Sequence, residues 1–249
     1  MAKERARSKD SEGAAPARRA SDRGHYGRLS RERVLAAALG LVDEEGLSAL
    51  SMRRLGARLG VEAMALYRYA EGKDALLDGL VEALYLELEE RLSAGSPRED
   101  SAPPDPAAWR GQLHRIARST YEVCMAHPQA VPLLTTRMLA VPLARRPLAV
   151  LREHERVLVL LRDAGLGPDR TAAVFHAFTG WVLGYISVEL RAMVDNPEEE
   201  DPAFRLGLHR MPPHELPRLR EIAATLAEPG GPQGLEAGLD ALLDGFATD

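Results

Sequence analysis

The sequence predicts an all-α protein, because three observations favour helices and none favours a sheet. Ala, Leu, Arg and Glu dominate the composition, and these residues have high helix propensity. Apolar side chains recur at spacings of three and four residues along most of the chain. Runs of β-branched residues are scarce, and no alternating strand pattern persists anywhere.

Length, charge and cysteine content narrow the class of protein. The 249 residues suffice for one large domain or two small ones with a substantial core. A net charge of -5 argues against nucleic-acid binding by the whole surface and leaves a local basic patch as the alternative. Cys124 is the only cysteine, so we expect a buried thiol and a reducing, cytoplasmic setting. No apolar stretch approaches eighteen residues, which predicts no membrane contact.

The N-terminal third predicts a polar arm followed by helices with clear start and stop signals. Residues 1–28 are polar and predominantly basic, so we expect a disordered arm, either a solvated tail or one that follows nucleic-acid phosphates. Ser30 is a candidate N-cap for a helix that Gly46 closes. Ser51 starts a second helix, which Gly60 interrupts.

Two more helices complete this part of the chain. A short helix is predicted over about 62–69, and another from Lys73 to about Ser93. The stretch 94–106 is rich in Pro, Gly, Ser and Asp and predicts a loop. The expected organisation is an arm, a first domain, a connecting helix and a second domain, with boundaries at 1–28, 29–75, 76–94 and 95–249.

The second domain also reads as helices. Its prolines limit the segment 130–147 to short helical pieces at best, and residues 196–213 form a Pro- and acid-containing connection. A Pro-Gly break at 229–232 separates the last two helices. The predicted helices are 109–127, 148–164, 169–194, 215–227 and 235–246.

The segment 51–73, SMRRLGARLGVEAMALYRYAEGK, carries the functional signal. It reads as two short helices joined through Gly60, and a glycine there permits the sharp turn of a helix-turn-helix. In that motif the second helix enters the major groove of DNA by its N-terminal end, and the first crosses the backbone. The spacing is shared by many helical hairpins, so the identity of the residues has to sharpen the interpretation.

Those residues resemble the tetracycline-repressor (TetR) family. The stretch LGVEAMALYRYAEGKDALLDGL has that family's short recognition helix with Leu66 and Tyr67, then a turn ending in Lys73; EEGLSALSMRRLGARLGV before it matches the same pattern. Less specific cues follow in MAHP around His127, in RDAGLGP and in TGWVLGYISVEL. The resemblance covers most of the chain beyond residue 28. It implies a three-helix helix-turn-helix domain followed by a larger helical domain for ligand binding and dimerisation.

The resemblance implies DNA-binding roles for eight residues. Arg53 matches a base-reading arginine, and arginine is the natural bidentate partner of guanine. Arg68 is a further base or phosphate contact, whereas Arg54 and Arg58 face either DNA or solvent. The remaining matches are base-edge positions at Ala63, Met64 and Ala65, and phosphate contacts at Tyr67, Tyr69 and Lys73.

Two positions depart from the tetracycline repressor. Ala63 stands where that protein has a glutamine on the recognition helix, so we expect a different operator. Ala70 stands where the family commonly has a large aromatic core residue, so local packing must be compensated. Tyr69 has the alternative of a half-buried core position.

Two apolar segments are expected to form a dimer interface. Residues 169–194 are apolar nearly all round and must be covered on every side, and Gly180 and Gly184 let a neighbouring helix approach closely. Residues 235–246 offer a second apolar stripe. Paired with their symmetry mates, these segments give the four-helix interface by which the family dimerises. Two-fold symmetry then predicts a palindromic operator, with recognition helices ~35 Å apart.

A ligand pocket is expected between the helices that begin near Trp109, Leu148 and Asp169. The family's tetracycline–magnesium site needs a histidine where this sequence has Leu133 and Leu134, so we expect no metal, no cofactor and a mainly apolar effector instead. Each candidate lining residue has ordinary core as its alternative. The candidates are Ile116, Thr120, Leu134, Met138, His176, Thr179 and Trp181.

Enzymatic interpretations lack support. The sequence has no HExxH, no GxSxG and no phosphate-binding glycine loop. We therefore predict a cytoplasmic, homodimeric DNA-binding regulator, a repressor that a small molecule releases. The alternative is a helical ligand-binding protein that no longer binds DNA, against which the set Arg53, Tyr67, Tyr69 and Lys73 argues. The effector, the operator, the regulated genes and repression versus activation stay open.

Overall fold

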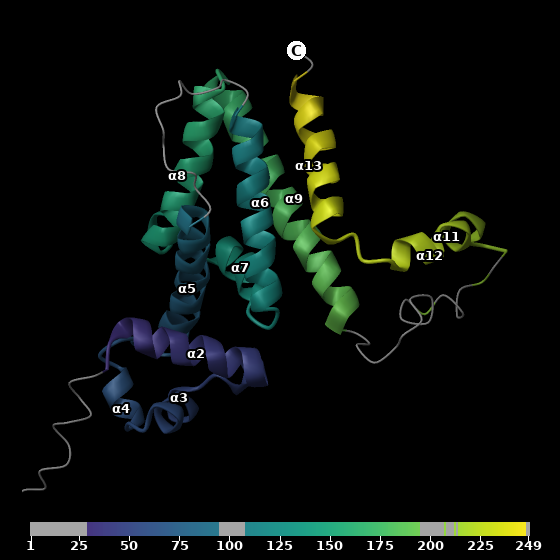
Figure 1. The fold of residues 1–249 in the computed structure, drawn as a ribbon. Helices are drawn as coiled ribbons and strands as arrows, with labels where there is room; N and C mark the ends of the chain where they lie inside the picture. The colour runs from purple at the N-terminus through teal and green to yellow at the C-terminus, as the bar shows by residue number, and fades with distance from the viewer. Residues whose placement is uncertain (1–28, 95–107, 195–206, 208–211, 213, 248–249) are drawn as a thin grey trace, which may run out of the picture.

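The computed structural model describes residues 29–94, 108–194, 207, 212 and 214–247 (Figure 1). These ranges contain α-helices, 3-10 helices, turns and bends, and the described residues include no β-strand. The predicted all-α class is therefore confirmed. The predicted arm at 1–28 lies outside the described residues. So do nearly all of the predicted loop at 94–106 and of the connection at 196–213.

The first domain is built by helix α2 (Arg31–Glu45), a 3-10 turn (Leu47–Ala49), α3 (Met52–Leu59) and α4 (Ala63–Leu66). Its helices begin where the sequence predicts, because serine hydroxyls accept the first free backbone N–H groups. Ser30 Oγ accepts from the N–H of Arg33 at 3.2 Å, and Ser51 Oγ accepts from that of Arg54 at 3.2 Å. Each cap sets the entry angle of its helix.

Two glycines make the turn between α3 and α4. Gly60 has φ 69° and ψ 29°, the left-handed conformation that ends a helix, and the next N–H, of Val61, donates to Gly56 O at 2.9 Å. Gly56 permits a close approach, since a Cβ there would lie 2.9 Å from Val61 O and 3.2 Å from the nitrogen of Ala63. The two helices of the motif are therefore held against each other backbone to backbone.

Helix α5 (Lys73–Ala94) runs from the first domain into the second (Figure 1). It packs against α2 at one end and against α6 (Ala108–Ala126) and α8 (Leu148–Asp163) along its length. The predicted boundary between residues 75 and 76 falls inside its first turn and stays a prediction. The second domain also contains α9 (Pro168–Val194), α11 (Pro217–Glu221), α12 (Ala223–Ala227) and α13 (Gly231–Ala247).

The segment 130–147 is more helical than predicted. It forms the ten-residue α7 (Val131–Ala140) and a 3-10 turn (Leu143–Arg145). Pro132 lies in the first turn of α7, where its missing N–H has no helical partner to lose. The same reasoning applies to α13, which begins at Gly231 with Pro232 in its first turn, so the predicted break is shorter than expected and spans 228–230.

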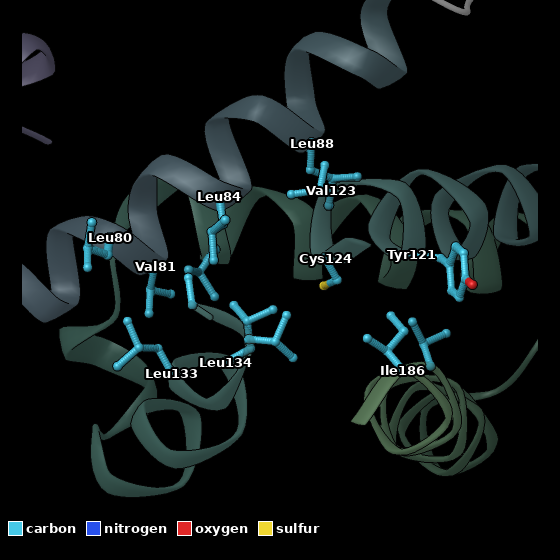
Figure 2. Packing of buried hydrophobic residues seen from close by; sticks show 14 of the residues in the cluster. Leu80, Val81, Leu84, Leu88, Tyr121, Val123, Cys124, Leu133, Leu134 and Ile186 are labelled. Carbon is cyan, nitrogen blue, oxygen red and sulfur yellow. The ribbon is translucent and has the colours of Figure 1, made fainter. Parts of the chain in front are cut away.

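A continuous apolar core joins the helices of the second domain. Figure 2 shows Leu84 and Leu88 of α5 facing α6 and α7, and Ile186 of α9 pointing toward α6. Cys124 lies in this core with 1% of its surface exposed, and burial raises the pKa of its thiol to about 12, so the predicted buried thiol is confirmed. The core fixes α5 against the helices that surround it.

Helices α9 and α13 pack side by side along one edge of the molecule (Figure 1). One described segment, Pro168–Leu190 of α9, is long and apolar enough to cross a membrane, with 28% of its most apolar window buried within the chain. The prediction that no apolar stretch of such length exists was wrong, because small residues keep this helix apolar. Within this chain it packs against α6, α7, α8 and α13.

Buried polar groups tie α9 to its neighbours. Glu189 accepts from the Tyr121 hydroxyl at 2.7 Å and from the N–H of Gly231 at 2.8 Å, and the Tyr185 hydroxyl donates to Gly231 O at 2.8 Å. Glu189 is 8% exposed, and both its carboxylate oxygens have partners. This network connects α6, α9 and the start of α13.

Candidate DNA interface and ligand pocket

Most of the residues predicted to contact DNA are exposed to solvent on the outer face of the helix-turn-helix. Arg53, Arg68 and Lys73 are exposed, Tyr67 is 45% exposed and Met64 is 73% exposed. A methionine so open on a four-residue helix covers no core of its own. The face combines an apolar tip with cationic and phenolic groups around it.

Two of the predicted contacts lie differently. Ala65 is 7% exposed, so its methyl packs inside the domain and not toward a base edge. It falls on the inner side of α4 beside the fully buried Leu66, as the helical period dictates. Tyr69 is half-buried and its hydroxyl donates to Leu29 O at 2.8 Å, the core alternative that the sequence left open. Ala63, the remaining position, is half-exposed.

The arginines that the sequence left undecided are engaged within the domain. Arg54 forms an ion pair with Glu45, and Arg58 forms a bidentate pair with Glu44. The Arg58 hydrogen bond lowers the pKa of Glu44, against a small opposing effect of burial. Arg53 forms no ion pair within the described residues, unlike Arg54 and Arg58. Its exposed guanidinium therefore projects outward from the domain.

His127 joins the two domains through a charge cluster. Its Nδ1 lies 2.8 Å from Oδ2 of Asp43 on α2, and its Nε2 lies 2.8 Å from Oε2 of Glu87 on α5. Burial opposes a charge on the imidazole, but the hydrogen bonds to both carboxylates outweigh it and raise the pKa of His127. The imidazolium therefore holds the end of α6 against α2 and α5.

A second tie connects α7 to the start of α5. The Arg137 guanidinium donates to Asp78 at 2.8 Å and to Asp74 at 3.2 Å, and it reaches the carbonyl of Asp74 at 3.4 Å. Because Asp74 directly follows Lys73 in α5, a movement of α7 acts on the helix that carries a predicted phosphate contact.

A cavity of about 760 Å³ opens between α7, α8 and α9 in the second domain. This volume is within the range of sites for drug-sized ligands. Most of its wall is apolar, with a few polar side chains among them. The lining consists of Leu134, Thr135, Leu143, Arg146, Leu151, His154, Glu155, Leu158, Phe175, His176, Thr179, Gly180, Leu183 and Gly184.

The predicted lining residues lie in different places. Leu134, His176 and Thr179 line this main chamber. Ile116 and Thr120 line a smaller inner chamber, of about 40 Å³, that shares His154, Thr179 and Leu183 with it. The side chain of Met138 lies outside the described ones.

Trp181 is not part of the chamber wall. Its Nε1 donates to Leu235 O at 3.1 Å, and its ring packs over Gly238 of α13. No described atom of this one chain lies within 4 Å of a Cβ at Gly180 or Gly184, so close approach of a helix from a second copy at these positions stays a prediction. Helical phase separates these positions: Trp181 faces α13, whereas Gly180 and Gly184 face the cavity.

The residues present do not fit a magnesium-bound ligand. Leu133 and Leu134 are buried, and Leu134 faces the cavity where a metal-binding imidazole would be needed. Among the described residues, no group of three or more His, Cys, Asp or Glu side chains gathers to hold a metal.

Comparisons with known proteins agree with this geometry. The family model for bacterial regulatory proteins of the tetR family matches residues 34–80, and that for the tetracyclin repressor-like C-terminal domain matches residues 102–249. The chain belongs to the TetR family. The two matches correspond to the helix-turn-helix end and to the domain that contains the cavity.

Relatives in the TetR family are repressors and regulators. The chain is 34% identical over 166 residues to the transcriptional repressor DrrR1 of Streptomyces coeruleorubidus, an alignment covering 67% of the chain and 56% of DrrR1. The chain thus spans little more than half the length of that relative. It is 28% identical to the class C tetracycline repressor of Escherichia coli, covering 88% of the chain and 91% of the repressor.

A solved structure shows the same architecture. The TetR-family protein ActR of Streptomyces coelicolor, in complex with actinorhodin, has a TM-score of 0.68 and 26% identity. The match covers 88% of this chain and 96% of ActR. The order of a TetR helix-turn-helix domain followed by a helical C-terminal domain is therefore shown for this chain.

Sequence reasoning missed several residues of both sites. The partners of His127 are 84 and 40 residues away in the sequence, and no local pattern pairs them. Gly56 had a signal, a glycine inside a strong helical pattern, which is typical of close packing. Glu153 and His154 of the inner chamber gave none, because adjacent polar residues on a helix usually face solvent.

Proposed function

We propose that this TetR-family chain is a homodimeric, sequence-specific DNA-binding repressor, released from a two-fold symmetric operator by a small, mainly apolar molecule. The observation that carries the proposal is the placement of two features in one chain. An exposed face with Arg53, Met64 and Lys73 lies at the start of α5, and the cavity of about 760 Å³ lies among α7, α8 and α9, of which α7 and α8 pack against α5.

The chemistry of the exposed face suits DNA. Arg53 supplies a guanidinium for guanine, and Met64 offers the apolar contact that a thymine methyl accepts. Tyr67 and Lys73 supply a hydroxyl and an ammonium for phosphates, and Arg68 adds a cation. Ala63 is exposed enough to contribute a small apolar surface, whereas Ala65 and Tyr69 act through packing.

A second copy of the chain is the natural cover for α9. Val188 is 73% exposed, and only 28% of the apolar window of this helix is buried within one chain. Together with α13, this edge supplies apolar surface for a symmetric interface. Val188→Glu should shift the protein toward monomer in sedimentation equilibrium. It should also weaken operator binding, because a monomer has one helix-turn-helix and can contact only half of a symmetric operator.

Release requires the ligand to favour one arrangement of the two domains. The ties at His127 and Arg137 connect the ends of α6 and α7 to α2 and α5, and α7 also contributes Leu134 to the cavity wall. A ligand that displaces α7 therefore acts directly on the helices that hold the readers. Relatives of the chain are regulators rather than enzymes, and we expect the same of it, working in the cytoplasm.

Selection of bound DNA from a random pool tests the proposal. A two-fold symmetric consensus supports it, whereas the absence of any selected sequence contradicts it and favours a ligand-binding protein without DNA binding. On the selected site, Arg53→Ala should cost about 1–3 kcal/mol of binding. The matched control is Arg54→Ala, because Arg54 is held by Glu45. Equal losses for the two variants would refute the assignment of Arg53.

Lys73 provides a separate check on the phosphate contacts. Lys73→Ala should weaken binding to every DNA sequence alike and reduce the salt dependence of the affinity by about one charge. A loss confined to the consensus would contradict the phosphate role.

A further inference from the structure

The inner chamber of the cavity has an unusual polar wall. Glu153 is 8% exposed and its Oε1 has no hydrogen-bond partner among the described residues, while its Oε2 is 3.3 Å from Nε of Arg156. Nε2 of the neighbouring His154 is also buried without a partner there. Both side chains line the inner chamber, and His154 lines the main chamber as well.

Unpaired polar atoms in a buried position are costly, so natural proteins rarely keep them without a function. Two at adjacent positions, both lining one chamber, indicate that something else supplies the missing hydrogen bonds. Thr120 does not supply them, because its hydroxyl donates to Ile116 O at 2.8 Å. A ligand group or water molecules that the ligand displaces can do so.

We propose that Glu153 and His154 form a polar anchor for the effector, which is an uncharged, apolar ring compound carrying a hydroxyl group that enters the inner chamber. This inference rests on the proposed function, since it takes the cavity as the effector site. It names the chemical class of the effector and the residues that select it.

The dimensions of the two chambers support this division. The inner chamber, at about 40 Å³, accommodates a small substituent or a few waters, whereas a single benzene ring occupies cavities of roughly 150 Å³. The ring system therefore remains in the main chamber of about 760 Å³, against Phe175 and Leu183. Only its polar substituent enters the inner chamber, whose wall includes Glu153.

The charges around the anchor favour a neutral hydroxyl over an ion. Burial raises the pKa of Glu153 to about 7, so near neutral pH its carboxyl group both donates and accepts hydrogen bonds. Burial and the nearby Arg146 lower the pKa of His154, which keeps the imidazole neutral. The same Arg146 lines the main chamber and repels a cationic ligand, whereas Glu155 in that chamber repels an anionic one.

A matched pair of probes tests the anchor: phenanthrene and its hydroxylated analogue phenanthrol, with phenanthrenylmethylamine as the cationic arm. Dissociation constants are measured for the full chain by fluorescence titration. The wild type should bind phenanthrol about tenfold more tightly than phenanthrene. In Glu153→Leu this ratio should fall to about one while phenanthrene binding is kept within about threefold.

Two further variants separate anchoring from folding. Glu153→Gln retains hydrogen-bonding capacity and should keep part of the hydroxyl preference. Asp163→Asn removes an exposed carboxylate from the same helix and should keep all of it. An unchanged ratio in Glu153→Leu, a preference for the amine, or no binding of either neutral probe by the wild type overturns the inference.

The operator assay on the same preparations distinguishes the two proposals. If DNA is bound but the ratio of the phenanthrene and phenanthrol dissociation constants is the same in Glu153→Leu as in the wild type, only the anchor is refuted. If the ratio collapses as expected but no operator is selected, the anchor stands and the repressor function fails.

Discussion

Two glutamates on neighbouring helices are equally buried but differ in whether their carboxylate oxygens have hydrogen-bond partners. Glu189 of α9 and Glu153 of α8 are each 8% exposed. Glu189 has partners on both oxygens, from Tyr121 and from the backbone of Gly231. Glu153 has one oxygen near Arg156 and the other unpaired beside a chamber.

The difference separates polar groups that hold the fold from those that await a ligand. The Glu189 network lies where three helices meet, and both carboxylate oxygens already have hydrogen-bond partners. The Glu153 side chain lines a chamber that shares His154, Thr179 and Leu183 with the cavity of about 760 Å³. Burial alone therefore does not tell a structural carboxylate from a binding one; the state of its hydrogen bonds does.

The sharpest test of this contrast is removal of the paired carboxylate. Glu189→Leu leaves the Tyr121 hydroxyl and the Gly231 N–H buried without partners, and we expect a loss of about 2–4 kcal/mol in unfolding free energy. Urea denaturation at fixed protein concentration measures it. A loss below about 0.5 kcal/mol would remove the basis for treating Glu189 as structural.

The opposite outcome is expected for the unpaired carboxylate, and its sign depends on pH. The raised pKa of Glu153 means that the folded protein holds this proton more tightly than the unfolded chain. The wild type therefore loses stability as pH rises from the ordinary glutamate range to about 7, and the loss is complete above it. Glu153→Leu should abolish this dependence and be more stable by about 1–3 kcal/mol at pH 8.

Thermal unfolding across pH 4.5 to 8 measures the gap between Glu153→Leu and the wild type. The gap should narrow toward the acid end, where the carboxyl group is protonated in the folded state and becomes protonated in the unfolded chain as well. Asp163→Asn is the matched control and should run parallel to the wild type. A variant that is less stable at every pH would show that Glu153 supports the fold after all.

The domain junction supplies an intermediate case, because His127 is paired on both ring nitrogens but is only partly buried. His127→Gln should cost about 1–2 kcal/mol at pH 6. The pKa of His127 is raised, so its stabilisation is complete below the ordinary histidine value and is lost as pH rises through the raised one. The cost of the substitution should therefore shrink in alkaline buffer, and a pH-independent cost would contradict the imidazolium.

The smallest change in unfolding free energy is expected for an ion pair that is exposed to solvent. Arg118 is 53% exposed and lies 3.2 Å from Glu236 and 3.5 Å from Glu122. Arg118→Ala should change the unfolding free energy by less than about 0.5 kcal/mol, because solvent screens such pairs. A larger loss would mean that α6 and α13 depend on surface charges.

The sequence predicts those parts of the molecule that are decided by neighbouring residues. Ser30, Ser51 and Gly60 mark helix ends because caps and left-handed turns depend on a few adjacent positions. The exposed side of the helix-turn-helix follows from the helical period of its apolar residues. Ala65 is the exception, because it lies on the inner face of α4. The errors at α7 and α13 came from treating proline as a breaker in a first turn that tolerates it.

The polar groups of both sites depend instead on contacts between distant segments. His127 meets Asp43 across 84 residues, and Glu153 acquires its burial from helices packed around α8. Trp181 was assigned to the pocket because its helix was expected there, but the tertiary contact with α13 decides which face of α9 is inside. Residue type gives the chemistry of such groups, and only the packing gives their role.

The backbone contact at Gly56 has a consequence for engineering. Atoms of Val61 and Ala63 are held against α3, and the buried Leu55 and Leu66 anchor the two helices from inside. The projecting side chains Arg53 and Met64 take no part in that scaffold. Base preference is thus separable from folding, and libraries randomised at these outward positions should yield repressors retargeted to new promoters that still respond to the original inducer.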